Sequence, residues 1–90
     1  MDTTDLIIHT FLSSTENLIS KQRIKRIIID DIIKERPELS HSNIHDIEKC
    51  ITTSIRNGVR RGIFQEPRGP SGPIQLNYRL VEEYLIRSRF

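Results

Sequence analysis

The chain has 90 residues, of which 36% are hydrophobic and 29% charged, so it is long enough for one small globular domain and unlike a disordered tail. Fourteen Lys and Arg against twelve Asp and Glu give a formal net charge of +2, and the single cysteine, Cys50, excludes an internal disulfide framework. No apolar run approaches the roughly 18–20 residues of a membrane-spanning helix, and the acidic N-terminus is not that of a signal peptide, so we expect no membrane partner.

The first part of the chain predicts two helices with a short strand between them. Residues 2–14 carry an apolar stripe at helical spacing, formed by Ile7, Ile8, Phe11 and Leu12. After a polar turn, the apolar pair Leu18-Ile19 is long enough only for a stub of strand. Ser20 is a favourable N-cap for a second helix over residues 21–35. Pro37 ends this helix, because proline lacks a backbone donor and disfavours helical conformation at the preceding residue.

The second predicted helix has an unusually broad apolar face. Its core stripe consists of Ile24, Ile27, Ile28 and Ile32. Two further isoleucines, Ile29 and Ile33, widen the apolar arc beyond what one core contact requires. These two side chains are therefore candidates for contact with another protein or with a second copy of the chain.

A third helix is predicted from Ser42 or Asn43 to about Arg61. Spacings of three and four residues align a core stripe of Ile44, Ile47, Ile51, Ile55 and Val59. The same spacings align an outer face of Lys49, Thr53, Arg56 and Arg60. Gly62 ends the helix, because glycine accepts the left-handed conformation of a C-terminal cap.

The remaining residues predict a β-hairpin and an extension. Ile63-Phe64-Gln65 forms one strand, residues 67–73 form a loop rich in proline and glycine, and the alternating Ile74, Leu76 and Tyr78 form the return strand. Residues 81–90 fit either a further helix or a continuation of the strand. We therefore expect an α+β domain over residues 1–80, in which a three-helix bundle carries a C-terminal β-hairpin, followed by an extension over residues 81–90.

Short motifs follow one another along these predicted elements. Thr4-Asp5-Leu6-Ile7 opens the first helix, and Ser20 with Ile24-Lys25 opens the second. The longest motif, over residues 55–65, reads Ile-Arg-Asn-Gly-Val-Arg-Arg-Gly-Ile-Phe-Gln, and Arg68-Gly69, Ser71-Gly72 and Leu76 follow it. In their order and spacing these motifs resemble the globular domain of linker histones, a winged-helix family, over roughly residues 3–78. The resemblance implies a winged helix, with the hairpin as its wing.

The resemblance further implies a nuclear, chromatin-associated domain that contacts the backbone of double-stranded DNA or of nucleosomal DNA. In that family, basic residues on helix three and the wing form one DNA site, and basic residues on helix two and near the first turn form a second. The matching DNA-binding positions in this chain are Arg26, Arg56, Arg60, Arg61 and Arg68. Lys49 joins them because it lies on the predicted outer face of helix three.

The chain departs from the family pattern at several positions that are usually basic. Thr52 stands in the middle of helix three, Glu16 in the turn after helix one, and Gln75 in the second wing strand. The long lysine-rich tail of the family is not part of these 90 residues. We therefore expect fewer phosphate contacts than a tail-bearing relative would make.

The distribution of charge favours a polyanionic partner for the C-terminal half. Residues 1–20 hold three acids and no Lys or Arg, whereas residues 56–90 hold seven Arg and three Glu. If about four or five phosphates are neutralised, the logarithm of the affinity should fall with the logarithm of the salt concentration at a slope of about −4. Asn57 is the one candidate for reading a base, so the sequence predicts low sequence specificity.

No pattern in the sequence indicates catalysis. His41, His45 and Cys50 lack a fourth ligand, and Cys50 falls on a different helical face from His45, so we expect no zinc site. The chain has no phosphate-binding Gly-Lys motif and no paired carboxylates in a plausible cleft. We therefore expect a protein that is not an enzyme and has no metal, cofactor or small-molecule substrate.

The alternative hypothesis is a winged helix that has become a protein-interaction or dimerisation module of a chromatin or transcription complex. Apolar residues outside the main core stripes motivate it: Ile29, Ile33, Tyr84, Leu85 and Phe90. A homodimer would also double the basic surface, so the two hypotheses are compatible.

Overall fold

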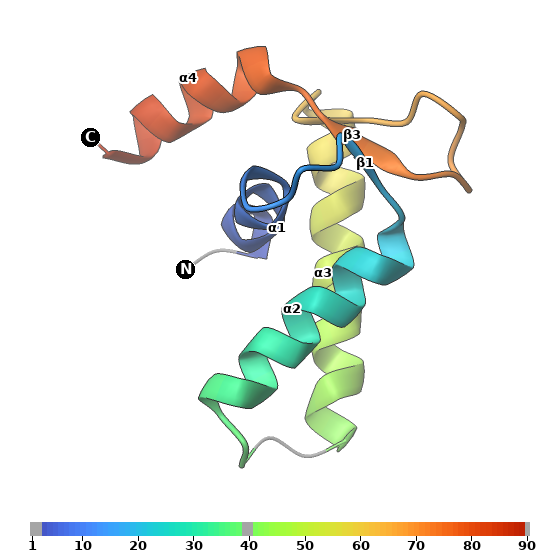
Figure 1. Ribbon diagram of the computed structural model, residues 1–90, viewed down its shortest axis with the longest axis vertical. Coiled ribbons are helices and arrows are strands. Elements are labelled where there is room, and N and C mark those ends of the chain that lie inside the picture. The colour runs from blue at the N-terminus through green and yellow to red at the C-terminus, as the bar shows by residue number, and fades with distance from the viewer. Residues whose placement is uncertain (1–2, 39–40, 90) are drawn as a thin grey trace.

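From the first helix to the third strand, the helices and strands follow one another in the order predicted from the sequence. The computed structural model describes residues 3–38 and 41–89. Along the chain it contains α1 (Thr3–Leu12), β1 (Leu18–Ile19), α2 (Lys21–Glu35), α3 (His41–Arg60), β2 (Phe64–Gln65), β3 (Ile74–Leu76) and α4 (Tyr78–Arg89). Helices α2 and α3 run side by side in opposite directions, and the sheet lies at the end where α2 begins and α3 ends (Figure 1). The protein is thus an α+β domain.

The three short strands form one antiparallel sheet in the order β1-β3-β2. The stub Leu18-Ile19 pairs with β3, with Ile19 opposite Ile74. On the other side of β3, Phe64 lies opposite Leu76. The predicted strand stub and the predicted hairpin are therefore confirmed, and β3 joins the segment before α2 to the segment after α3. The connection between β2 and β3, residues 66–73, is called the hairpin loop below.

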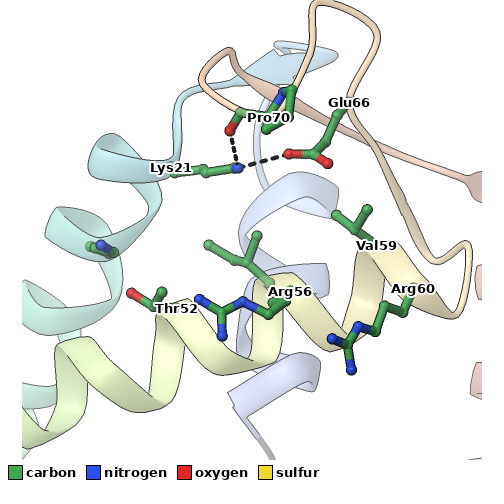
Figure 2. Close-up of a pocket in the computed structure, with 9 residues that line it drawn as sticks. Lys21, Thr52, Arg56, Val59, Arg60, Glu66 and Pro70 are labelled. Atoms are coloured by element: carbon green, nitrogen blue, oxygen red, sulfur yellow. Dashed lines mark hydrogen bonds and ion pairs between the residues drawn. The ribbon is translucent and has the colours of Figure 1, made fainter.

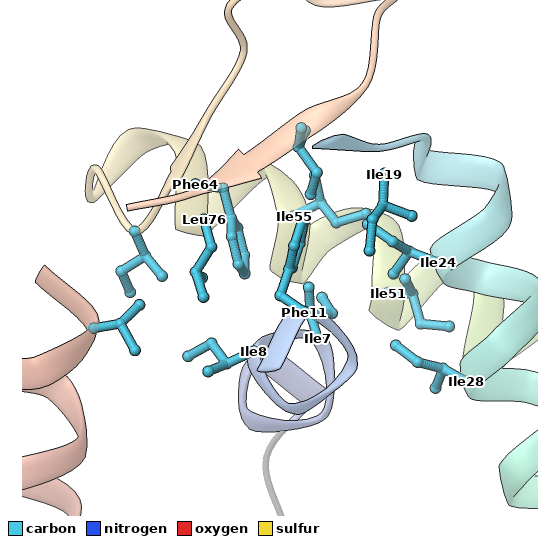
Figure 3. Packing of buried hydrophobic residues seen from close by; sticks show 13 residues of the cluster. Ile7, Ile8, Phe11, Ile19, Ile24, Ile28, Ile51, Ile55, Phe64 and Leu76 are labelled. Carbon is cyan, nitrogen blue, oxygen red and sulfur yellow. The ribbon is translucent and has the colours of Figure 1, made fainter. Parts of the chain in front are cut away.

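A core of mostly isoleucine side chains holds the helices against the sheet (Figure 3). The α2 and α3 stripes contribute Ile24, Ile28, Ile51 and Ile55, each at most 3% exposed. The rings of Phe11 on α1 and Phe64 on β2 stack with their centroids 6.2 Å apart. Full burial of a side chain of this size stabilises a fold by about 1.5–3 kcal/mol, so this cluster fixes how the hairpin sits on α3.

The ends of the helices follow the predicted signals. The Ser20 side chain caps α2 by accepting a hydrogen bond from the Arg23 backbone N–H. Arg36, which precedes Pro37, leaves the helical conformation with φ −133° and ψ 75°. Gly62 after α3 has φ +79°, the left-handed conformation expected of a C-terminal glycine.

Two expectations at the ends of elements were wrong. Leu12, predicted within the apolar stripe of the first helix, is 49% exposed, because it is the last residue of α1 and Phe11 fills the core beside it. Tyr78, predicted in the return strand, is the first residue of α4 and is 48% exposed. The backbone oxygen of Asn77 accepts a hydrogen bond from the Val81 N–H, so the helix starts where β3 stops.

The C-terminal segment takes the helical of its two predicted conformations. Helix α4 extends away from the hairpin loop (Figure 1), and Val81 in its first turn is buried in the core. The described helix therefore begins before the extension that the sequence predicts over residues 81–90. Among the described residues, no helix combines the length and apolarity that crossing a bilayer requires.

Candidate nucleic-acid interface

A groove of about 360 Å³ lies where the start of α2, the second half of α3 and the hairpin loop meet (Figure 2). Its charged lining residues are Lys21, Lys25, Arg56, Arg60 and Glu66. Its other lining residues are Thr52, Ile55, Val59 and Pro70. These nine residues define what is called the basic groove below.

The four cations of the basic groove come in two pairs, each spaced by one helical turn. Lys21 and Lys25 stand on α2, and Arg56 and Arg60 stand on α3. Residues four apart lie on the same face of a helix, so the packing of α2 against α3 brings both pairs to one groove. Both arginine side chains are exposed. The arrangement concentrates positive charge on a concave surface, where it attracts anions.

The hairpin loop is fastened to α2 at the edge of the basic groove. The Lys21 Nζ lies 2.8 Å from Oε2 of Glu66 and also donates a hydrogen bond to the backbone oxygen of Pro70. The loop itself is a pair of tight turns, in which the Gly69 N–H donates to the Glu66 oxygen and the Gly72 N–H to the Gly69 oxygen. The side chain of Lys21 thus connects α2 to Glu66, which opens the first turn, and to Pro70, which follows it.

The floor of the basic groove is largely apolar. Ile55 is 3% exposed and belongs to the core, and Val59 packs against that core. The Thr52 hydroxyl donates to the Glu48 backbone oxygen 3.0 Å away, one turn earlier on α3. The charged groups therefore form the rim, and a ligand that seats here meets cations at the sides and methyl groups beneath.

The structure brings some of the sequence-predicted DNA-binding residues together and leaves others apart. Arg56 and Arg60 line the basic groove. Arg68 lies in the hairpin loop between the lining residues Glu66 and Pro70, but does not itself line the groove. The remaining predicted residues are exposed outside the groove: Arg26, Lys49 and Arg61. On α3 the groove is lined by Thr52 and not by Thr53, which was predicted on the outer face. The face of α3 that lines the groove is therefore closer to the core than the predicted outer face.

Sequence reasoning did not assign Lys21 and Lys25 to the site. Both residues are half-buried, whereas Arg26, which was predicted, is exposed. The signal was present in the sequence, because Lys21 and Lys25 flank the core residue Ile24 at a spacing of four. The spacing does not predict the path of the hairpin loop, which places Glu66 and Pro70 next to this part of α2.

Glu16, in the turn after α1, forms an ion pair with Arg23 on α2. The Arg23 Nη1 on α2 donates a hydrogen bond to Oε2 of Glu16. This hydrogen bond and the charge of Arg23 lower the pKa of Glu16, and the same contact raises the pKa of Arg23. Both side chains are about half exposed, and the pair places a negative charge beside one cation of α2.

A second hollow lies between α1, the end of α2 and the start of α3 and has a volume of about 1190 Å³. Its apolar lining consists of Leu6, Ile27, Ile28, Ile32 and Ile47. Its rim mixes acids with bases: Asp31, Glu35 and Asp46 stand beside His9, Lys34 and Arg36. Because the charges are mixed, this hollow is a poorer site for a polyanion than the basic groove.

The residues predicted for a dimer interface divide into two groups. Ile29 is half-buried and packs against the core, and Ile33 is half-buried. The side chains of Tyr84 and Leu85, and the whole of Phe90, lie outside the described residues. The contact with the core explains why an apolar residue stands at position 29 without a partner protein.

Of the residues considered for a metal site, two have described side chains, and the side chain of His41 lies outside the described residues. Cys50 is a free, exposed cysteine, and His45 is exposed. Within the described part of the chain, no three side chains of the metal-ligating types come together.

Comparison of the chain with family models, with curated proteins and with solved structures gives no match.

Proposed function

We propose that this chain is a winged-helix domain of the linker-histone type that binds double-stranded DNA, free or on nucleosomes, through the phosphate backbone in the nucleus. It acts as a binding domain rather than as an enzyme. The fold supports the proposal in three particulars: the strand stub before α2, the sheet order β1-β3-β2, and the hairpin loop beside the end of α3. In this reading α3 is the helix that faces DNA and the hairpin loop is the wing.

The observation that carries the proposal is the convergence of Lys21, Lys25, Arg56 and Arg60 on one groove beside the hairpin loop. Arginine offers a planar fork that suits phosphate oxygens, and lysine offers a compact charge on a flexible stem. Cations from two helices along one concave surface match a strand of phosphates better than they match a single small anion. Arg68 is exposed in the hairpin loop, and we assign it to a neighbouring phosphate.

The lining of the basic groove also supports binding without sequence preference. Base edges are read in the major groove by bidentate Arg, Asn or Gln side chains, and none of the nine lining residues is Asn or Gln. Asn57 is exposed on α3 but stands outside the groove. We assign Arg56 and Arg60 to phosphates because they share the groove with Lys21 and Lys25. Phosphate contacts position a protein on DNA without carrying sequence information.

Measurement of duplex binding at several salt concentrations tests the proposal. Two duplexes of unrelated sequence should bind with similar affinity, and the logarithm of the association constant should fall with the logarithm of salt at a slope of about −4. Replacement of Arg56, Arg60 and Arg68 by Glu should abolish binding at low salt. If wild-type protein does not bind either duplex at low salt, the proposal is wrong.

The alternative function, a protein-interaction or dimerisation module, stays a prediction from the sequence. The packing of Ile29 against the core weakens one of its two supports on α2. Light scattering at high protein concentration tests it directly, because a strict monomer leaves no role for self-association.

A further inference from the structure

The hairpin loop brings a carboxylate into a groove that is otherwise lined by cations. Glu66 is the one acidic residue among the described residues that line the basic groove. Its side chain is 20% exposed and that of Lys21 is 30% exposed, so water reaches both partners. A negative charge at this place is unexpected in a site for phosphates, because it repels the ligand and also engages one of the four cations.

We propose that Glu66 limits the affinity of the basic groove by holding Lys21 in the free protein, and that a bound phosphate takes Lys21 from it. This inference rests on the proposed function, in which the groove seats phosphates of DNA. Carboxylate and phosphate oxygens are the same kind of acceptor for an ammonium group, so they compete for Lys21. Glu66 then keeps the binding of phosphate weak and reversible.

The geometry of Lys21 suits an exchange of partners. Its ammonium group has three donors on a flexible four-carbon stem, and two acceptors, Glu66 and the Pro70 backbone oxygen, engage it in the free protein. Rotation about the stem turns the ammonium from Glu66 toward the groove, where Lys25 and Arg56 also stand. The hydrogen bond to Pro70 can persist during this exchange and keep the hairpin loop in place.

A purely structural clasp makes the opposite prediction. If the Lys21–Glu66 pair served only to hold the hairpin loop, neutralising Glu66 would loosen the loop and weaken DNA binding. If Glu66 competes with phosphate, neutralising it strengthens binding, because Lys21 no longer has to leave a partner. The direction of the change in duplex affinity separates the two, because only the competition predicts tighter binding.

The test compares Glu66→Gln with Glu82→Gln, which makes the same change of charge at an exposed residue of α4 outside the groove. The probes are a duplex of arbitrary sequence and inorganic tripolyphosphate. We expect Glu66→Gln to bind the duplex about two- to fivefold more tightly than Glu82→Gln at low salt, the range of a partly exposed ion pair. The salt slope should match that of Glu82→Gln, because Lys21 contacts phosphate in the complexes of both variants.

Adding Lys21→Ala gives the matching double variant. The gain from Glu66→Gln should shrink in the Lys21→Ala background, because the cation to be released is missing. A gain of the same size with and without Lys21 would overturn the exchange. So would duplex affinity that is equal in Glu66→Gln and Glu82→Gln, or weaker in Glu66→Gln.

Tripolyphosphate separates failure of this inference from failure of the proposed function. If neither wild type nor Glu66→Gln binds the duplex, the proposed function fails, and tighter tripolyphosphate binding by Glu66→Gln than by Glu82→Gln still supports the exchange. Equal or absent tripolyphosphate binding then overturns it. A measurement on the wild-type protein does not depend on how the variants fold: saturation with whichever probe binds should move the carboxyl carbon signal of Glu66 and not that of Glu82. An unmoved Glu66 signal would overturn the exchange.

Discussion

Gly58 on α3 lies against the ring of Phe64 on β2, and a Cβ atom at Gly58 would overlap Cδ2 and Cε2 of that ring. Gly58 is buried in the helix two residues after Arg56, and Phe64 in turn stacks on Phe11 of α1. The missing side chain therefore lets the hairpin approach α3 closely. This contact fixes the strand from which the hairpin loop leaves toward the basic groove.

Replacing Gly58 with Ala should destabilise the protein, although alanine is the better helix former. Helix propensity alone favours alanine over glycine by about 1 kcal/mol. The overlap with Phe64 opposes it, because over-packing of a well-packed core typically costs about 1–3 kcal/mol. We expect a net loss of stability in chemical denaturation, and no loss for Asn57→Ala at the exposed neighbouring position. Stabilisation by Gly58→Ala would mean that Phe64 does not pack there.

Asn77 should stabilise the junction between the sheet and α4. Its side-chain Nδ2 donates to the Gly62 backbone oxygen 3.0 Å away, and its backbone N–H donates to the Ile63 oxygen at 2.8 Å. Asn77→Ala removes only the first of these bonds and leaves the partly buried Gly62 oxygen without that donor. We expect a loss of about 0.5–1.5 kcal/mol in unfolding free energy. Thermal unfolding of the variant equal to that of wild type would contradict the assignment.

The ion pair between Glu16 and Arg23 should be visible in a pH titration. Because Arg23 lowers the folded-state pKa of Glu16, the stability that this pair contributes is present above the unfolded-state pKa. It is lost as the pH falls through the lowered folded-state pKa. Carboxyl NMR should place the Glu16 midpoint below its ordinary value of 4.5, and Arg23→Gln should move it back up. A midpoint that ignores Arg23→Gln would show that the pair does not form in solution.

Thr52 offers a way to strengthen the basic groove. Its side chain lines the groove, whereas that of the neighbouring Thr53 is exposed on α3 outside it. Thr52→Lys should therefore tighten duplex binding and make the salt slope more negative by about 0.9, as one added phosphate contact would. Thr53→Lys adds the same charge on the same helix and should change the slope less. Equal slopes for the two variants would argue against the groove as the contact surface.

The sequence predicted several helix ends well because the signals for them are local. The cap at Ser20, the stop before Pro37 and the left-handed Gly62 each depend on one or two neighbouring residues, and each was confirmed. Tyr78 was misassigned because the alternating pattern through β3 extends past the last strand partner. The end of β3 and the start of α4 depend on Asn77, which donates hydrogen bonds to Gly62 and Ile63, residues that are distant in the sequence.

The candidate site was only partly predictable for a related reason. Arg56 and Arg60 stood out because they share a helical face with other polar residues. Lys21 and Lys25 enter the same groove only through the packing of α2 against α3 and the path of the hairpin loop. Neither relationship follows from spacing within one helix. The role of Glu66 is still less visible, because it depends on a contact with Lys21 across 45 residues of sequence.

The claim that the basic groove seats DNA phosphates is tested most directly by two matched double charge reversals. Arg56→Glu with Arg60→Glu changes the groove, and Lys34→Glu with Arg36→Glu makes the same change of net charge at the far end of α2. We expect the groove variant to lose at least about tenfold in duplex affinity relative to its control. Its salt slope should become less negative, from about −4 to about −2, since two phosphate contacts are removed. Equal affinities and equal slopes for the two variants would contradict the account.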